Sequence, residues 1–548
     1  MIDPASGISS HDALAPDART DDSPAVLGSE KGAPATPQRP RRRMVAAAGD
    51  VTFVLLLSFE IIRSLRHAMW HDETQVFMIA AGSSSLWQLF HNLRLEAHPA
   101  LWYVLVWLIT RVTADPIWMQ VLHTVLAVGV WVVVYRYSPF STADKFLLLL
   151  SYFLFWEYFV ISRSYVLIAL IGFAFVLLRE RRPRPELALW LLAGLLANVH
   201  VYGAIWSMVL AAMLVIEAPQ RNSKMMMGAA LYLVLLAFAV ATIAPPADFG
   251  PWPSGGVRFD LYRLKADLNV PFGAFVPLRP DLIRETFAYL AHPGSAAIPR
   301  FWNANPTDYF VALLKLDAHH PMRIAAVFAA PIAVCWLIVR APLRMLEFAF
   351  VYFGILLFQN LWDFSGSVRH HGVVFLAFIA TVWTSLLRRQ PDMVSRSLFA
   401  VVLAINAFAG LSTLASELRP WSEGKDAANW IRKNNLENAF LIGWRDGPVS
   451  TVAAYLDRPI YYLECQCTGT FIVSNNRRQV LRSPQQFRER LTTAFALAGQ
   501  RDAILIANRP VSSEQLDTGA LGISATLLQS LTAAPFQENY WIYRLAKK

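Results

Sequence analysis

Charged residues are scarce in this sequence. Asp, Glu, Lys and Arg make up 16% of its 548 residues, against about 25% in an ordinary soluble domain. The deficit is concentrated in repeated apolar runs of roughly 16–22 residues, which are long enough to cross a bilayer as helices. The sequence therefore predicts a mainly α-helical, polytopic membrane protein.

Cysteine is also scarce, with three residues in the whole chain. Cys335 lies within an apolar run, whereas Cys465 and Cys467 are separated by a single residue. We interpret that separation as too short for an ordinary unstrained bridge. No disulfide framework is therefore expected.

Acidic residues are outnumbered by basic ones, which gives a formal net charge of +10 at pH 7. In a soluble protein this excess would suggest nucleic acid. Here Lys and Arg cluster in short loops between apolar runs, as in loops that hold spans in orientation. We expect membrane lipids as partners and no nucleic acid.

The first 43 residues lack an apolar pattern and are rich in Ala, Pro, Ser and Asp. They end in a basic cluster before an apolar run at 44–65, which predicts a disordered cytoplasmic tail. Residues 44–416 are expected to form a transmembrane domain of about 11–13 helices, with outer loops at 67–98 and 246–320. The runs after the first cover 99–113, 117–135, 145–160, 163–179, 187–200, 201–217, 225–244, 322–339, 345–359, 372–387 and 397–416.

Basic loops near residues 180, 222, 342 and 392 would be cytoplasmic by the positive-inside rule, which places the residues after 416 outside. Twelve simple spans from an inner N-terminus would instead return the chain to the inside. One run between residues 65 and 135 is therefore not a simple crossing. The run 99–113 is short enough to be tilted or half-inserted.

Two segments outside the spans have patterns of their own. Residues 74–81 and 86–93 have amphipathic helical spacing and are expected to lie along the membrane interface, with Ser83 to Ser85 capping the second. Residues 417–548 alternate predicted strands and helices, which favours a small α/β domain outside the membrane.

Ionisable residues collect on one side of this scheme. Asp72, Glu73, Glu96 and His98 follow the first span, and such groups are costly beside a membrane unless they have a function. Further polar residues fall at the other outward turns, namely Glu157, Arg163, Asn198, His200, Tyr202, Arg369, His370 and His371. One-sided placement favours an enzyme working at the outer surface, because a transporter is expected to place polar groups near the bilayer midplane.

Each candidate also has a structural interpretation. Asp72 can cap an interfacial helix, and Glu73 can be its solvated neighbour. His98 can begin a helix before Pro99, and His200 can be a packing residue. Glu157 and Arg163 can form a structural ion pair. His370 and His371 cannot both face one cavity if they are helical, so at least one is expected to be structural.

The combination of motifs resembles the GT-C superfamily of membrane glycosyltransferases, in particular the bacterial branch related to protein O-mannosyltransferases and lipid A aminoarabinose transferases. The resemblance rests on His-Asp-Glu at 71–73, Glu-Ala-His-Pro at 96–99, Arg-Ser-Tyr at 163–165 and His-Val-Tyr-Gly at 200–203. It covers the architecture of residues 44–400.

The resemblance implies transfer of a sugar, with inversion, from a polyprenyl-phosphate carrier to a lipid, glycan or protein acceptor on the periplasmic face of the bacterial inner membrane. It implies that Asp72, with Glu73, is the catalytic acid pair, with Asp72 as general base. Arg163, Arg369 and His370 would balance the donor phosphate.

Glu96, His98 and His200 have ligand types suited to a divalent metal cation, the candidate cofactor. The sequence departs here from the Glu-x-Pro spacing of the aminoarabinose branch, because Ala97 and His98 separate Glu96 from Pro99. The loop 246–320, with Trp252 and Trp302, is a candidate lid. The alternative function is a non-enzymatic carrier or assembly factor for lipid-linked saccharides.

Overall fold

The computed structural model describes residues 38–218, 222–244, 257–278, 321–362, 366–499, 501–515, 522–534 and 538–547, with a few isolated residues between them. The chain divides into two compact units, Met1–Asp50 and Val51–Lys548. The second unit holds every element described below except the first part of α1.

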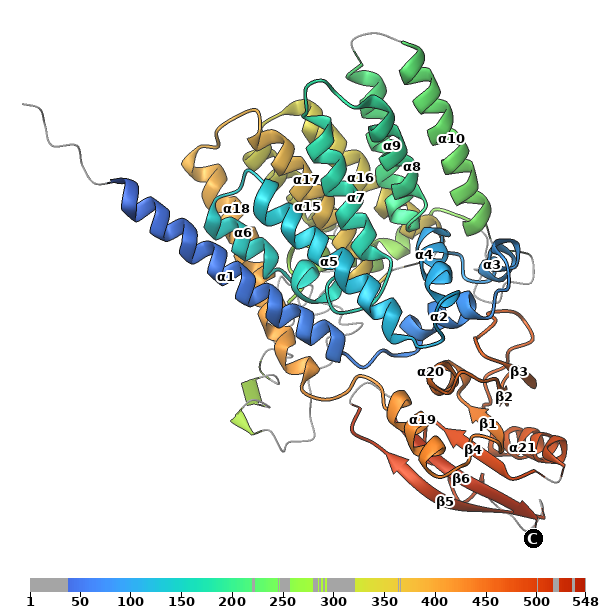
Figure 1. The fold of residues 1–548 in the computed structure, drawn as a ribbon. Helices are drawn as coiled ribbons and strands as arrows, with labels where there is room; N and C mark the ends of the chain where they lie inside the picture. Colours follow the sequence, from blue (N-terminus) through green and yellow to red (C-terminus); the bar gives the residue numbers. More distant parts are fainter. Residues whose placement is uncertain are drawn as a thin grey trace, which may run out of the picture. The chain divides into compact units, whose positions relative to one another are not determined.

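Helices dominate the described residues before the C-terminal region, as predicted (Figure 1). In the described part of the chain, five helical segments are long and apolar enough to cross a membrane: Ile117–Tyr137, Ser223–Ile243, Pro321–Val339, Pro342–Trp362 and Met393–Ala415. The helices are α1 (Gln38–Arg66), α2 (His71–Ala81), α3 (Leu86–Leu93), α4 (Leu101–Thr110), α5 (Ile117–Tyr137), α6 (Thr142–Leu149), α7 (Tyr165–Arg179), α8 (Glu186–Ala197), α9 (Val201–Ile216), α10 (Ser223–Ile243), α11 (Leu264–Asp267), α12 (Asn269–Phe275), α15 (Pro321–Val339), α16 (Pro342–Trp362), α17 (Val368–Leu386) and α18 (Met393–Ser412).

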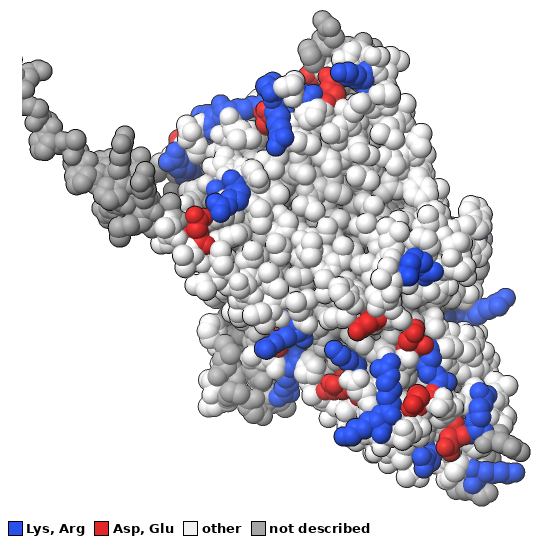
Figure 2. Space-filling model, viewed as in Figure 1, with Lys and Arg blue, Asp and Glu red and all other residues white. Residues whose placement is uncertain are grey.

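The surface chemistry agrees with a membrane protein. Figure 2 shows a broad area of uncharged side chains over the helices, with Lys, Arg, Asp and Glu gathered at its two ends. Large apolar side chains on α10 are exposed, including Met226, Val234 and Val240 at 69%, 66% and 57%. Such a surface is expected where lipid rather than water surrounds a helix.

Two predicted runs are not full-length helices. Helix α4 has 10 residues, or about 15 Å of rise, which is half of a hydrocarbon core of about 30 Å. This helix is therefore too short to cross a bilayer by itself, and whether it is tilted or half-inserted stays a prediction. The run 145–160 is also broken, because the Ser151 side chain accepts the Leu154 N–H and begins a separate π-helical turn, Tyr152–Glu157. Gly410 of α18 packs against the backbone at this break, where a Cβ would lie 2.0 Å from the Leu150 oxygen.

Within the predicted loop 246–320, the described residues 257–278 include two short helices that the sequence does not reveal. Helices α11 and α12 follow a 3-10 turn at Leu261–Arg263, and residues 269–274 of α12 are buried. Gly273 lies against His371 of α17, where a Cβ would come within 2.3 Å of Nδ1. Part of this segment is therefore core. Trp252 and Trp302 lie outside the described residues.

A buried ionic cluster joins three helices at the end of the bundle that carries the predicted basic loops. Arg179 Nη1 lies 2.9 Å from Glu347 Oε1, and Arg179 Nη2 lies 2.9 Å from Glu217 Oε1. Arg344 Nη1 lies 2.8 Å from Glu347 Oε2. Arg184, which is less buried, adds a third contact at 3.3 Å from Glu217 Oε2. The two buried arginines, Arg179 and Arg344, thus each contact both carboxylates, which compensate their charges.

Replacing Glu347 with Gln is expected to destabilise the protein by roughly 3 kcal/mol, because it leaves buried guanidinium charge uncompensated. Thermal unfolding in detergent measures the effect. The matched control is Glu180→Gln, which breaks a partly exposed pair with Arg388 and should cost about 0–1 kcal/mol. Equal losses in the two variants would contradict a structural role for the buried cluster.

The C-terminal region forms the predicted α/β fold. A six-stranded sheet has the order β3-β2-β1-β4-β6-β5, in which β1 lies parallel to both β2 and β4. The elements are α19 (Gly424–Lys433), β1 (Phe440–Trp444), α20 (Asp446–Leu456), β2 (Ile460–Tyr462), β3 (Cys467–Gly469), α21 (Pro484–Ala498), β4 (Ala503–Ala507), β5 (Ile523–Leu531) and β6 (Tyr540–Lys547).

Helices cover both faces of this sheet (Figure 1). Successive strand residues point to opposite faces, so Leu441 packs with α19 and α20 while Ile442 packs with α21. The edge strands β3 and β5 are absent from the sequence prediction. Strand β3 has only three residues, and β5 is mostly half-buried with a single buried residue, so neither shows a clear apolar pattern.

The expectation about cysteines is wrong. Cys465 and Cys467 form a disulfide with Cα atoms 5.2 Å apart, which is within the usual range for a bridge. The residue between them, Gln466, has a φ of 51°. This turn after β2 brings the two Cβ atoms together, which an extended chain would not do.

Candidate functional site

The candidate site begins at the turn between α1 and α2, within the first loop (residues 67–98). Helix α2 starts at His71, and its capping carboxylate belongs to Glu73, which accepts the Trp70 N–H at 3.3 Å. Asp72 is therefore not the cap. It stands in the first turn of α2, where a negative charge is favoured, and its side chain is 28% exposed.

Asp72 meets two arginines from distant parts of the chain. Its Oδ2 lies 2.8 Å from Arg369 Nη1 at the start of α17 and 3.4 Å from Arg163 Nη1 before α7. Arg163 also donates to the Asp72 carbonyl at 2.5 Å. Burial alone would raise the pKa of Asp72, but the two guanidinium groups outweigh it and hold the pKa well below its usual range. The carboxylate is thus ionised and only partly enclosed.

Arg163 does not pair with Glu157, contrary to the structural interpretation of that couple. The Glu157 carboxylate instead accepts a hydrogen bond from the Tyr152 hydroxyl at 3.1 Å. The positive charge of Arg163 is therefore directed to the first loop.

Glu73 is fully buried, so it is neither a solvated neighbour nor open to a substrate. Its Oε1 accepts the Ser162 N–H at 2.6 Å, and its Oε2 lies 3.0 Å from His67 Nε2. The other ring nitrogen of His67 lies 3.0 Å from Glu417, which follows α18. The sequence analysis expected Glu73 to act with Asp72 as a catalytic acid. Because both of its oxygens are engaged inside the protein, Glu73 instead holds the turn between α1 and α2 in place.

His67 predicts a pH dependence of stability. Burial lowers its pKa, but Glu417 and Glu73 outweigh burial and raise the pKa to about 10, above about 6.5 for an unfolded His. A group with a raised folded pKa contributes stability that is complete below the unfolded value and is lost as pH rises through the folded one. The melting temperature should therefore fall between about pH 6.5 and 10, and His67→Gln should flatten this fall. An unchanged slope in that variant would assign the loss to other groups.

A cluster of aromatic and imidazole rings adjoins the arginines. Tyr165 and His370 pack on His200, with ring centroids 5.1 and 5.5 Å from it. His98 lies at 5.8 Å from His200. His370 faces this cluster while His371 faces α12, as expected for adjacent helical residues. The structure thus brings His98, His200 and His370 together.

The residues predicted to bind a metal are Glu96, His98 and His200. Among the described residues, no three His, Cys, Asp or Glu side chains are placed to hold one ion. His200 Nδ1 accepts the Tyr202 N–H at 3.2 Å, so its proton is on Nε2, next to the Tyr165 hydroxyl. The Glu96 carboxylate accepts from Gln75 at 2.9 Å. The Nδ1 lone pair of His200 is therefore already used by a hydrogen bond within the chain.

Glu96 and His98 are instead polar residues at the edge of the cluster. Burial raises the pKa of Glu96 to about 7 and lowers that of His98 to about 4, with Arg163 adding to the fall. His98 donates from Nδ1 to the Glu96 carbonyl at 2.5 Å. His98 is therefore neutral at neutral pH.

Two acids that contact the candidate site were missed by the sequence analysis. Glu538, just before β6, accepts the His71 N–H at 2.9 Å and also bonds His71 Nδ1. Glu417 bonds His67 and accepts the Trp156 indole N–H at 3.0 Å. Neither acid lies in a recognisable motif, so no sequence signal distinguishes them from surface residues.

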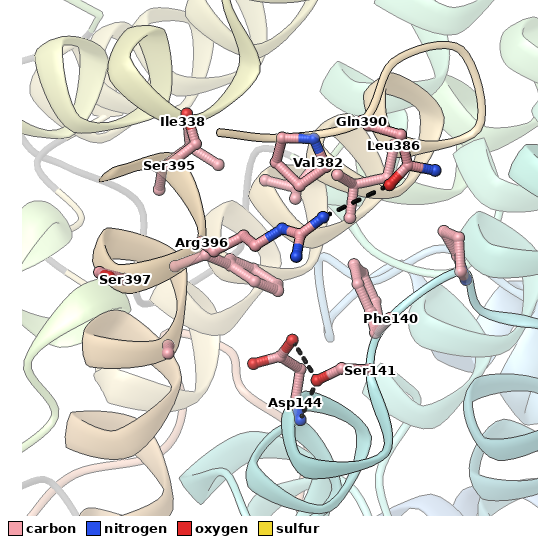
Figure 3. Close-up of a pocket in the computed structure, with 14 residues that line it drawn as sticks. Phe140, Ser141, Asp144, Ile338, Val382, Leu386, Gln390, Ser395, Arg396 and Ser397 are labelled. Atoms are coloured by element: carbon pink, nitrogen blue, oxygen red, sulfur yellow. Dashed lines mark hydrogen bonds between the residues drawn. The ribbon is translucent and has the colours of Figure 1, made fainter. Parts of the chain in front are cut away.

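A separate cavity of about 590 Å³ lies among the ends of α6, α15, α17 and α18. Figure 3 shows Asp144 beside Ser141 and Arg396 directed toward Gln390 within it. None of the predicted site residues lines this cavity, so it is not part of the Asp72 cluster.

No protein-family model and no curated protein sequence matches the chain. Among solved structures, the chain is similar to a cryo-electron-microscopy structure of the arabinofuranosyltransferase AftD from mycobacteria, with 13% identity and a TM-score of 0.35. The match covers 90% of this chain and 40% of that chain.

Proposed function

We propose that the chain is an inverting glycosyltransferase of the bacterial inner membrane that takes its sugar from a polyprenyl-phosphate carrier. It would act on the periplasmic face, where an envelope lipid, glycan or protein is the acceptor. One observation carries the proposal: a partly exposed carboxylate, Asp72, shares two arginines from segments far apart in sequence. The GT-C-like motifs around these residues add support.

In this mechanism Asp72 accepts the proton of the acceptor hydroxyl as that oxygen attacks the anomeric carbon. The new bond forms as the bond from the anomeric carbon to the phosphate oxygen breaks, and the polyprenyl phosphate leaves with the electron pair. Attack opposite the leaving group inverts the configuration.

Arg163 and Arg369 stabilise the negative charge of the leaving phosphate. Two guanidinium charges against one carboxylate leave one positive charge for a phosphate. When the phosphate takes part of their hydrogen bonding, Asp72 loses stabilisation of its ionised form and becomes a stronger base. His370 follows Arg369 in the first turn of α17 and is proposed to line the same phosphate site. Glu73 is proposed as a positioning residue.

The test uses the purified full-length protein with polyprenyl-phosphate-linked sugars and extracted envelope glycolipids. Release of free polyprenyl phosphate, with the sugar recovered on an acceptor, is the expected result. Binding or translocation of the intact donor without cleavage of the sugar–phosphate bond would overturn the proposal in favour of a carrier. Mass spectrometry of envelope glycans from cells with and without the protein then identifies the acceptor.

A further inference from the structure

A second cavity lies in the C-terminal α/β region, at the ends of its parallel strands. It has a volume of about 480 Å³. Arg445 follows β1, Glu464 follows β2 and Arg509 follows β4, and all three line it. No residue predicted from the sequence as a site residue lies there.

The topology of the sheet explains this location. The chain leaves β1 through α20 to reach β2 on one side, and later returns through α21 to β4 on the other side. The connections from this part of the sheet therefore diverge to opposite faces at the carboxyl end of β1. In open α/β sheets, ligands bind in the crevice at this kind of switch point.

The cavity has cationic groups available for an anion. Among the described residues, neither the Arg445 nor the Arg509 guanidinium forms a hydrogen bond or an ion pair, whereas Arg478 pairs with Asp446. Burial and the neighbouring charge of Arg509 both lower the pKa of Arg445. Two close positive charges of this kind are stabilised by a shared anion.

A buried acceptor accompanies the arginines. Glu464 is 5% exposed, and its Oε1 accepts the Arg445 N–H at 2.7 Å. Its Oε2 is buried and has no hydrogen-bond partner among the described residues. A buried carboxylate oxygen without a donor is costly, and a ligand hydroxyl would satisfy it.

We propose that this cavity binds an anionic saccharide. Its phosphate or carboxylate group lies between Arg445 and Arg509, and a ring hydroxyl donates to Glu464. Gly447, at the start of α20, borders the first loop, since a Cβ there would lie 3.8 Å from His71 Cδ2. Next to the first loop, a bound saccharide could be the acceptor glycan, held there by this site. That role rests on the proposed function, whereas the binding of an anionic saccharide does not.

Binding is measured by calorimetry on the full-length protein in lipid nanodiscs. The probes are glucose 1-phosphate and glucuronate, with glucose and inorganic phosphate as references. At least one anionic sugar should bind more tightly than both references. Arg509→Gln and Glu464→Gln should each weaken that binding by about tenfold or more. The matched control, Arg477→Gln, removes an exposed arginine that does not line the cavity and should leave binding unchanged.

A variant that tightens binding is also needed, because a loss of binding could result from misfolding whereas a gain could not. Val480 lines the cavity and is 74% exposed, so Val480→Lys adds positive charge at a position that contributes little to the core. It should tighten binding of the anionic sugar. Failure of both anionic sugars to bind, inorganic phosphate or glucose binding as tightly as they do, or equal affinity in Arg509→Gln would each overturn the proposal. Asp72→Asn should bind the probe normally, which separates this result from any failure of transfer.

Discussion

Replacing Asp72 with Asn is expected to lower the turnover of sugar transfer by about 10³-fold, within the range for loss of a general base. The amide has the same shape and its oxygen can still accept from Arg369, so the fold should persist. The two arginines would face the donor phosphate without a competing carboxylate. The KM for the donor should therefore stay the same or fall while kcat collapses.

The matched control is Asp115→Asn, which alters an exposed acid before α5 outside the cluster. Steady-state kinetics with release of polyprenyl phosphate as the readout separates kcat from KM. Full turnover in the Asp72 variant, or a loss expressed only in KM, would remove Asp72 from the role of base.

Replacing Arg369 with Gln is expected to lower kcat/KM by about 10²–10³-fold, because the leaving phosphate loses a charge-assisted hydrogen bond. The pH profile should change as well. In the native protein both guanidinium groups hold the pKa of Asp72 well below its usual range, so Asp72 contributes no acid limb at ordinary pH. Loss of one of them lets this pKa rise, and activity should then fall at low pH as Asp72 becomes protonated.

Arg94→Gln is the control for this variant, since Arg94 is an exposed arginine of the first loop. Rates are measured from about pH 4 upward, close to the ordinary pKa of Asp. The Arg369 variant should then show an acid limb in its pH–rate profile that the native protein lacks. An acid limb at the same position in both proteins would show that Arg369 does not set the ionisation of Asp72.

The fold could be predicted where local patterns determine it. Apolar runs identified most of the helices, and the two predicted amphipathic segments form helices α2 and α3, with Ser85 accepting the Gln88 N–H at 3.2 Å to cap the second. The central strands β1, β2 and β4 were visible for the same reason, because a strand covered on both faces is apolar throughout. Helix α12 was missed because its seven residues include Pro271 and Gly273, which favour a loop by propensity.

The sequence predicted which residues form the candidate site better than it predicted how they pair. Asp72, Arg163 and Arg369 do converge, but their pairing depends on tertiary contacts that no local pattern encodes. The partner of His71 is 467 residues away. Likewise, Glu73 looks like its neighbour in sequence, and only the structure shows that Ser162 and His67 enclose it.

The carboxylates that bond His67 and His71 have a consequence for biosynthesis. The first loop leaves the ribosome early, whereas Glu417 and Glu538 lie 350 and 467 residues further along. At roughly 5–20 residues per second, translation reaches the second acid about 20 to 90 seconds after the loop. His67 therefore lacks the Glu417 counter-charge until that residue is made, and His71 lacks that of Glu538 for longer still. This part of the molecule reaches its final arrangement only after residue 538 has been synthesised.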